Sequence, residues 1–168
     1  MSPALPDGEV PPSDGSLPSS VVEGAHERDF GVYLHVPFCT VRCGYCDFNT
    51  YTSSELGGGA SQDSYAKTAV QEIALASRVM DEVGLPAREV STVFVGGGTP
   101  TLLPVDDLAL MVAAVRERWG LSPNAEVTTE ANPDSVTPQS LAALVEAGFT
   151  RISFGVQSAV PQVLATLD

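Results

Sequence analysis

Short apolar runs and longer helical segments alternate along the chain from residue 30 onward. The runs at 30–36, 90–95, 125–130 and 151–154 are brief and apolar or β-branched, which predicts buried strands. The segments 63–83, 105–119 and 138–147 are predicted helices, and a further helix begins near residue 159. In the first of them Ala69, Ile73, Ala76 and Met80 recur at helical spacing. This order predicts an α/β fold with a parallel sheet and right-handed crossovers.

The segment before the first strand has a different composition. Residues 1–28 are rich in proline, glycine, serine and acidic residues, so we expect a disordered acidic tail, with residues 29–168 as the folded part. A second flexible stretch is expected at 56–61, which reads Leu-Gly-Gly-Gly-Ala-Ser. The first ten residues lack the basic start and apolar core of a secretory signal. No apolar run approaches the roughly 18 residues of a membrane helix, so a cytoplasmic location is predicted.

Charge narrows the set of partners. The chain has 8 Lys and Arg against 21 Asp and Glu, a formal net charge of −13. Phosphate backbones and anionic lipid surfaces repel such a protein, so neither nucleic acid nor a membrane is an expected partner. At 43% hydrophobic residues the chain can form a core, which excludes a wholly disordered protein.

Three cysteines lie within eight positions, at Cys39, Cys43 and Cys46. An odd count fits a disulfide framework poorly. Three clustered thiolates can hold three irons of a four-iron cluster and leave the fourth iron open to a small molecule. One alternative is a zinc site with His35 or a distant residue as the fourth ligand. Another is three unrelated core thiols.

Polar or glycine-rich segments follow the other predicted strands. In parallel α/β folds the chemistry gathers at the carboxyl ends of the strands, so we expect these segments to share one site with the cysteines. Gly-Gly-Gly-Thr-Pro at 96–100 can let a backbone approach a ligand, or can be an ordinary tight turn. Glu130 can bind a ligand, or form an ion pair with Arg151. Gln157 can line a site or be a surface amide.

Five motifs give the chain a resemblance to a known family. They are Tyr-Leu-His-Val-Pro-Phe-Cys at 33–39, the Cys-x3-Cys-x2-Cys loop, Gly-Gly-Gly-Thr-Pro-Thr at 96–101, Glu-Ala-Asn-Pro at 130–133 and Ser-Phe-Gly-Val-Gln at 153–157. In this order they resemble the radical S-adenosylmethionine (SAM) superfamily. The resemblance is strongest to the branch that contains oxygen-independent coproporphyrinogen III oxidase and the haem chaperone HemW. It implies the N-terminal part of a partial TIM-type (β/α)6 barrel, truncated after about four strands.

The resemblance also implies roles for individual residues. Cys39, Cys43 and Cys46 would hold a [4Fe–4S] cluster, whose electron splits bound SAM to a 5′-deoxyadenosyl radical. The residues implied in binding the cofactor are Tyr33, Tyr45, Gly97, Gly98, Thr99, Glu130 and Gln157. From the residues alone, Tyr33 and Tyr45 can equally be core aromatics, and His35 is expected to be a packed strand residue outside the site.

The position two residues after the third cysteine favours one subgroup. The oxidases carry another cysteine there, whereas this chain has Phe48, the pattern of the haem chaperones. We therefore expect a haem chaperone in haem or porphyrin metabolism, with the oxidase and a non-catalytic metal-binding module as alternatives. The partners implied are haem or a porphyrin, an electron donor and a haem-receiving protein. Because residue 168 falls inside the fourth helix, we expect a fragment that is inactive alone.

Overall fold

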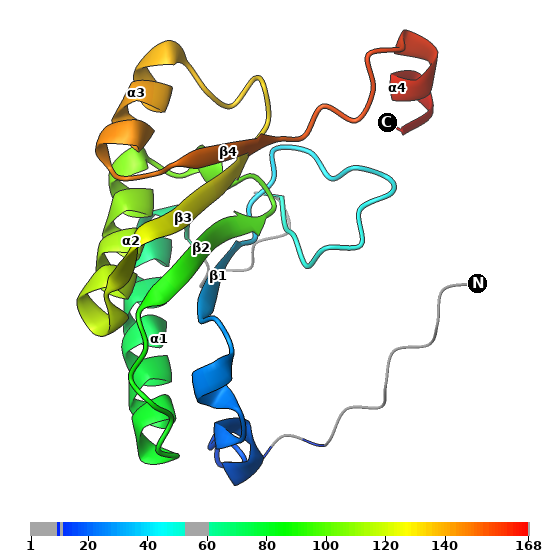
Figure 1. Ribbon diagram of the computed structural model, residues 1–168. Helices are drawn as coiled ribbons and strands as arrows, with labels where there is room; N and C mark the ends of the chain where they lie inside the picture. Colours follow the sequence, from blue (N-terminus) through cyan, green and yellow to red (C-terminus); the bar gives the residue numbers. More distant parts are fainter. Residues whose placement is uncertain (1–9, 11, 53–60, 168) are drawn as a thin grey trace.

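A four-stranded parallel sheet organises the described part of the chain, which comprises residues 10, 12–52 and 61–167 of the computed structural model. The strands follow the chain in the order β1-β2-β3-β4, and a helix follows each of them (Figure 1). The α/β prediction is therefore confirmed. The elements are β1 (Gly31–Val36), α1 (Gln62–Glu82), β2 (Val90–Gly97), α2 (Val105–Trp119), β3 (Leu121–Ala131), α3 (Pro138–Glu146), β4 (Arg151–Phe154) and α4 (Pro161–Leu167).

Helix α3 begins at a capping residue and helix α2 ends at a glycine, as the sequence predicted. Thr137 caps α3, its hydroxyl accepting a hydrogen bond from the Ser140 N–H at 3.1 Å, while the Ser140 hydroxyl accepts one from the Thr137 N–H. Gly120 ends α2 at a φ of 75°, a region that glycine occupies without strain. These two helices therefore begin and end where the sequence indicated.

Strand β3 is longer than predicted. It begins at Leu121 rather than residue 125, and its register against β2 shifts between Val90 and Thr92. The extra residues include Pro123, which has no N–H to donate to a sheet. Such a residue is tolerated where the pairing is irregular, so apolar periodicity alone could not detect this part of the strand.

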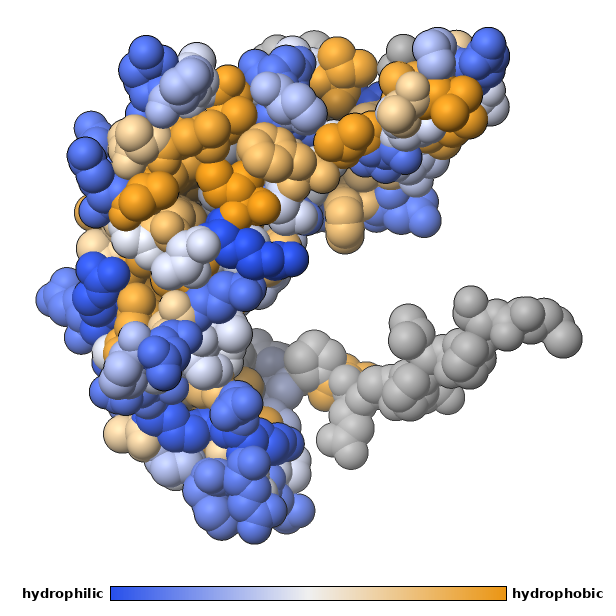
Figure 2. Space-filling view, turned by 45° about the horizontal axis from the view of Figure 1, so that its top comes forward, coloured by the Kyte–Doolittle hydropathy of each residue, from blue (hydrophilic) through white to orange (hydrophobic). Residues whose placement is uncertain are grey.

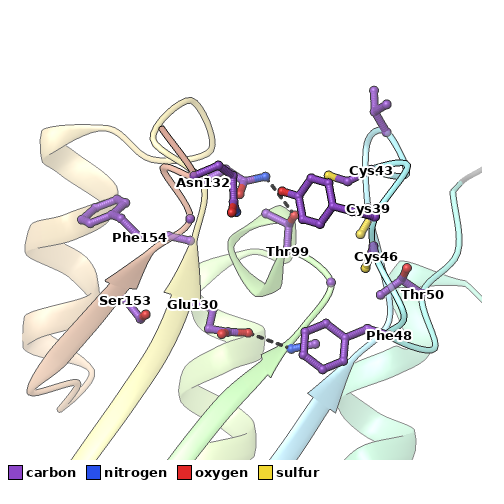
Figure 3. A pocket seen from close by; sticks show the side chains of 17 residues that line it. Cys39, Cys43, Cys46, Phe48, Thr50, Thr99, Glu130, Asn132, Ser153 and Phe154 are labelled. Carbon is purple, nitrogen blue, oxygen red and sulfur yellow. Dashed lines mark hydrogen bonds between the residues drawn. The ribbon is translucent and has the colours of Figure 1, made fainter. Parts of the chain in front are cut away.

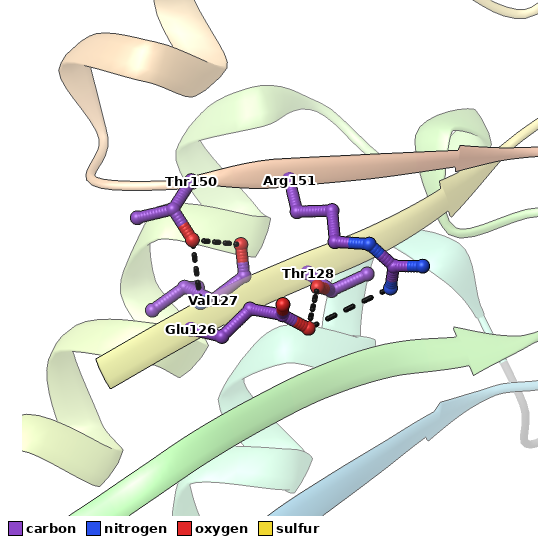
Figure 4. Close-up of polar contacts among 5 residues, drawn as sticks. All are labelled: Glu126, Val127, Thr128, Thr150 and Arg151. Carbon is purple, nitrogen blue, oxygen red and sulfur yellow. Dashed lines mark hydrogen bonds and ion pairs between the residues drawn. The ribbon is translucent and has the colours of Figure 1, made fainter. Parts of the chain in front are cut away.

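Helices α1, α2 and α3 cover one face of the sheet (Figure 1). Because side chains alternate along a strand, Val93 and Val95 of β2 point to this face and are buried with Leu108, Met111 and Val112 of α2. The opposite face carries more polar residues, among them Glu126, Thr128 and Arg151 (Figure 4). The sheet thus has one packed face and one face without helices.

The chain before β1 is more ordered than predicted. Residues Ser19–Val22 and Ala25–Glu27 form short 3-10 helices, and Ala25 is 1% exposed. Arg88 donates hydrogen bonds to the carbonyls of Ala25 and Arg28, and its guanidinium lies 5.1 Å from the centre of the Phe30 ring. The prediction of an unstructured segment up to residue 28 is therefore wrong for 19–27, because Arg88 ties it to the core. Residues 1–9 and 11, and 56–60 of the expected flexible stretch, lie outside the described residues.

The segment after β4 exposes several apolar side chains. Phe154, Val156, Val160, Val163 and Leu164 are 41–55% exposed, and α4 has no buried residue. Figure 2 shows apolar residues gathered along the upper part of the molecule, including the segment around α4. Among the residues that the structure describes, no helix is both long and apolar enough to cross a membrane.

Candidate cofactor site

A cleft of about 210 Å³ lies where the carboxyl ends of the strands meet the loop after β1 (Figure 3). Its walls come from segments after all four strands, as the parallel topology predicted. Nine of the ten predicted site residues line it: Cys39, Cys43, Cys46, Tyr45, Gly97, Gly98, Thr99, Glu130 and Gln157. The structure therefore brings residues more than 110 positions apart into one cavity.

The cysteine loop, residues 39–50, is closed by backbone hydrogen bonds at its base. The Tyr51 N–H donates to the Pro37 carbonyl at 2.7 Å, and the Cys39 N–H donates to the Tyr51 carbonyl at 3.0 Å. Near the tip, the Cys46 N–H donates to the Cys43 carbonyl at 3.1 Å. All three cysteines are free thiols, and Cys43 is exposed. The loop therefore presents three thiols to the cleft from a closed base.

Cys39 has the most enclosed environment described among these thiols. Burial raises the pKa of Cys39, because the charged thiolate is harder to solvate there. The nearby side chains of Thr50 and Thr99 act in the opposite direction, and the neighbouring cysteines raise the pKa further. The surroundings of this sulfur thus contain two donors that favour its charged form.

The glycine turn, residues 96–99, lies against the base of the cysteine loop, and Gly97 and Gly98 leave no space for a Cβ. Gly97 has a φ of 115°, and a Cβ there would lie 2.7 Å from the His35 ring. A Cβ on Gly98 would lie 2.4 Å from the Phe38 carbonyl oxygen and 3.0 Å from the Cys39 sulfur. Glycine is therefore needed here first of all because the turn packs tightly against the base of the cysteine loop.

Glu130 connects β3 to this turn. Its carboxylate accepts a hydrogen bond from the Gly97 N–H at 3.0 Å (Figure 3). The alternative prediction of an ion pair between Glu130 and Arg151 is wrong. Arg151 instead lies 3.6 Å from the carboxylate of Glu126, which also accepts a hydrogen bond from the Thr128 hydroxyl (Figure 4). Arg151 pairs with Thr128, two positions along β3 from both Glu126 and Glu130, and the Glu130 carboxylate is already engaged by the Gly97 N–H.

Gln157 has a backbone conformation that suits a functional position. Its φ of 60° is the only positive value at a non-glycine residue in the described chain. Such conformations cost free energy and occur often at ligand-binding sites. Gln157 and Tyr45 both line the cleft and are exposed, so the interpretation of Tyr45 as a core aromatic is wrong.

Tyr33 is the predicted site residue that does not line the cleft. Its hydroxyl is 2.9 Å from Nδ1 of His35, and its ring stacks on Phe94 with centres 6.1 Å apart. Burial raises the pKa of Tyr33, and the negative charge of Glu130 adds to the effect. Tyr33 therefore lies on the open face of the sheet, near the cleft, and its contact with a cofactor stays a prediction.

His35 joins β1 to the cysteine loop. Its Nε2 is 2.8 Å from the Asn49 carbonyl, which can only accept, so Nε2 carries the proton and Nδ1 accepts from Tyr33. Both ring nitrogens are thus engaged, which removes His35 as the fourth ligand of a zinc site. The prediction of a packed residue outside the ligand set fits this geometry.

Sequence reasoning missed three polar residues that line the cleft, Asn132, Thr50 and Ser153. Asn132 donates from its side chain to the Thr99 hydroxyl oxygen at 3.2 Å and so joins β3 to the glycine turn. Asn132 is part of the Glu-Ala-Asn-Pro motif, and this position in the motif could have indicated that it belongs to the site. Thr50 is 2% exposed and lines the cleft beside the cysteines. Nothing in the sequence distinguishes it from a loop threonine.

The donor set fits an iron–sulfur cluster in its chemistry. Three free thiols of one loop line a single cleft, and thiolates are the usual ligands of such clusters. Within the described residues, no three Cys, His, Asp or Glu side chains are grouped so that they could hold a metal ion. The three thiols therefore line one cavity, but they are not already arranged around a common metal position.

Curated relatives match most of this chain. It is 53% identical over 141 residues to "Heme chaperone HemW" of Mycobacterium tuberculosis, covering 84% of this chain and 35% of that protein. It is 38% identical over 127 residues to the protein of the same name from Escherichia coli, covering 76% of this chain and 32% of that protein. The chain thus spans about a third of the length of these relatives.

A solved structure and a family model agree with these matches. The coproporphyrinogen III oxidase HemN of Escherichia coli, described as a radical SAM enzyme, superposes with a TM-score of 0.71 at 26% identity, over 89% of this chain and 33% of that one. This confirms the predicted fold. The family model "Radical SAM superfamily" matches residues 33–167, from β1 into α4. With this match over most of its length, the chain belongs to the radical SAM superfamily.

Proposed function

We propose that this chain binds a [4Fe–4S] cluster through Cys39, Cys43 and Cys46, and SAM in the cleft beside them. The observation that carries the proposal is the convergence of these cysteines with Gly97–Thr99, Glu130 and Gln157 on one cleft. Family membership supports it, because radical SAM proteins are defined by this pair of cofactors. When bound, the pair supplies reductive cleavage of the sulfonium of SAM.

The chain's own residues provide binding and orientation. The glycine turn leaves room for backbone contact with a ligand, and the carboxylate of Glu130 provides negative charge beside it. Gln157 offers both donors and acceptors from the wall formed after β4. Tyr45 adds an exposed aromatic surface beside the cysteines, suited to a flat heterocycle.

We further propose that the protein acts as a haem chaperone in haem and porphyrin metabolism. Similarity to two proteins named "Heme chaperone HemW" supports this, as does Phe48, which stands in the cleft where the oxidases carry a cysteine. The partners would be haem, an electron donor and a haem-receiving protein. The alternative of a coproporphyrinogen III oxidase is supported by the likeness to HemN.

Iron and sulfide analysis after anaerobic reconstitution tests the cluster. About four of each per chain are expected, with complete loss of the four-iron form in Cys43→Ala, because each thiolate holds one iron. Arg151→Met, on the open face of the sheet, is the matched control and should keep the full cluster. A single zinc per chain would contradict the proposal and favour a non-catalytic metal-binding module.

Two assays separate the proposed functions. Titration with haem should show saturable binding to the complete protein, and incubation with coproporphyrinogen III, SAM and a reductant should release no carbon dioxide. Porphyrinogen decarboxylation without haem binding would instead support the oxidase. Displacement of bound haem by an acceptor haemoprotein would then test delivery.

A further inference from the structure

Thr50 carries a buried hydroxyl with no hydrogen-bond partner. The residue is 2% exposed, and its Oγ1 is one of two buried side-chain polar atoms without a partner in the described chain. Buried hydroxyls are nearly always paired, because desolvating an unpaired one costs free energy. This oxygen therefore points to a partner that belongs in the cleft.

The backbone fixes Thr50 next to the first cysteine. Its neighbour Tyr51 forms hydrogen bonds with both Pro37 and Cys39, in an isolated parallel bridge between Phe38 and Tyr51. Thr50 and Cys39 both line the cleft, and Figure 3 shows Thr50 beside the sulfur atoms of Cys39 and Cys46. A loop closed in this way leaves Thr50 little freedom to turn away.

Thr99, which also lines the cleft, provides a second hydroxyl one residue after Gly98, where an added Cβ would lie 3.0 Å from the Cys39 sulfur. Thr99 is 5% exposed, and its N–H donates to the Phe38 carbonyl at 2.7 Å. Its hydroxyl oxygen accepts a hydrogen bond from the Asn132 amide, so its own proton remains available to donate.

We propose that Thr50 and Thr99 donate hydrogen bonds to the Cys39 sulfur when it is a cluster ligand, and thereby raise the reduction potential of the cluster. The inference rests on the proposed function. A reduced cluster carries one more negative charge than the oxidised form, so donors to a ligand sulfur stabilise the reduced form more. Thr50 would be a positioning and tuning residue that does not itself touch SAM.

The test measures the midpoint potential of the reconstituted cluster without SAM. An anaerobic titration with dithionite and redox mediators, followed by electron paramagnetic resonance, is run on the parent chain and on Thr50→Val and Thr50→Ser. Valine keeps the shape and removes the hydroxyl, whereas serine keeps the hydroxyl. Thr128→Val is the matched control, because Thr128 is 0% exposed, lies outside the cleft and donates to Glu126.

We expect Thr50→Val to shift the equilibrium towards the oxidised cluster by roughly tenfold, which lowers the midpoint potential by about 59 mV for one electron. Thr50→Ser should stay within a third of that shift from the parent value, and Thr128→Val should not change it. If valine prevents cluster assembly, Thr50→Ala is measured against Thr50→Ser instead.

Three outcomes would count as failures, and they can be distinguished. A hydroxyl-free variant with a full complement of iron and the parent potential would overturn this inference and leave the cluster assignment standing. A parent chain that assembles no four-iron cluster would overturn the proposed function itself. A shift shared equally by Thr50→Ser and Thr50→Val would also overturn the inference, because it would reflect altered packing.

Discussion

The glycine turn and the cysteine loop form neighbouring walls of one cleft, but they are held in different ways. The turn is enclosed: Gly96 and Gly97 are buried, and an added Cβ at Gly97 or Gly98 would meet neighbouring atoms within 3 Å. In the loop, Val41 and Phe48 are 72% and 59% exposed. Close packing and hydrogen bonds to Glu130 and Asn132 therefore hold the turn, whereas the loop depends on its closed base and a few polar links.

This difference suggests that the turn and the loop have different roles in binding. A wall shaped by packing can present a binding surface before any ligand arrives, which lowers the cost of binding. A loop with an exposed tip can take up a bulky inorganic group, and its thiols reach their final positions only as ligands. Changes in the turn should therefore affect folding, and changes in the loop should affect cluster retention.

The largest effect is expected for Gly98→Ala. Its Cβ would lie 2.4 Å from the Phe38 carbonyl oxygen, so the backbone would have to move, at a cost of about 1–3 kcal/mol in the free energy of unfolding. Chemical denaturation measures this. Gly155→Ala is the control, because its nearest neighbours lie at 3.4 Å and 3.5 Å, an ordinary contact. Equal stability of the two variants would contradict the description of a tightly packed turn.

A smaller effect, on binding alone, is expected for Glu130→Gln. The amide oxygen can still accept the hydrogen bond from the Gly97 N–H, so the turn and the unfolding free energy should be unchanged. Loss of the negative charge should weaken SAM binding by about tenfold, or roughly 1.4 kcal/mol. Equilibrium binding to the cluster-loaded protein checks this, with iron content measured on the same preparation. Unchanged affinity would show that Glu130 only supports the turn.

His35→Phe should break the link between β1 and the cysteine loop. It keeps an aromatic ring but removes the hydrogen bonds to Tyr33 and Asn49. Each is worth about 1 kcal/mol, so iron loss to a chelator should become several-fold faster while the fold persists. Tyr33→Phe removes only the bond to Nδ1 and leaves the bond to Asn49 in place. If Tyr33→Phe accelerates iron loss as much as His35→Phe does, the anchor to Asn49 is not what retains the cluster.

The smallest effect is expected for Arg151→Met, outside both walls. The ion pair with Glu126 joins two half-exposed side chains at 3.6 Å, and such pairs contribute about 0–1 kcal/mol. Thermal unfolding should shift little, and SAM affinity should not change. A large loss of SAM affinity would show that the binding site includes the open face of the sheet, contrary to the distinction drawn between the cleft and that face.

The order of elements and most of the site residues follow from local features of the sequence. Apolar runs of strand length, the Thr137 cap and Gly120 mark where strands and helices begin and end, because these signals act within a few residues. Parallel topology then places the ends of successive strands at one edge, which is why nine of the predicted residues line the cleft. The cysteine spacing predicts a metal or cluster site before any coordinates are known.

Tertiary packing decided the rest, through contacts between residues far apart in the chain. The register of β3 and β4 pairs Arg151 with Thr128, midway between Glu126 and Glu130, and its guanidinium lies beside Glu126. Arg88 orders residues 25–28 from 60 positions away. Thr50 is buried in the cleft that Cys39 also lines, where the loop closes on Pro37. Composition and spacing determine which groups the protein has, but the free energy of packing determines which of them meet.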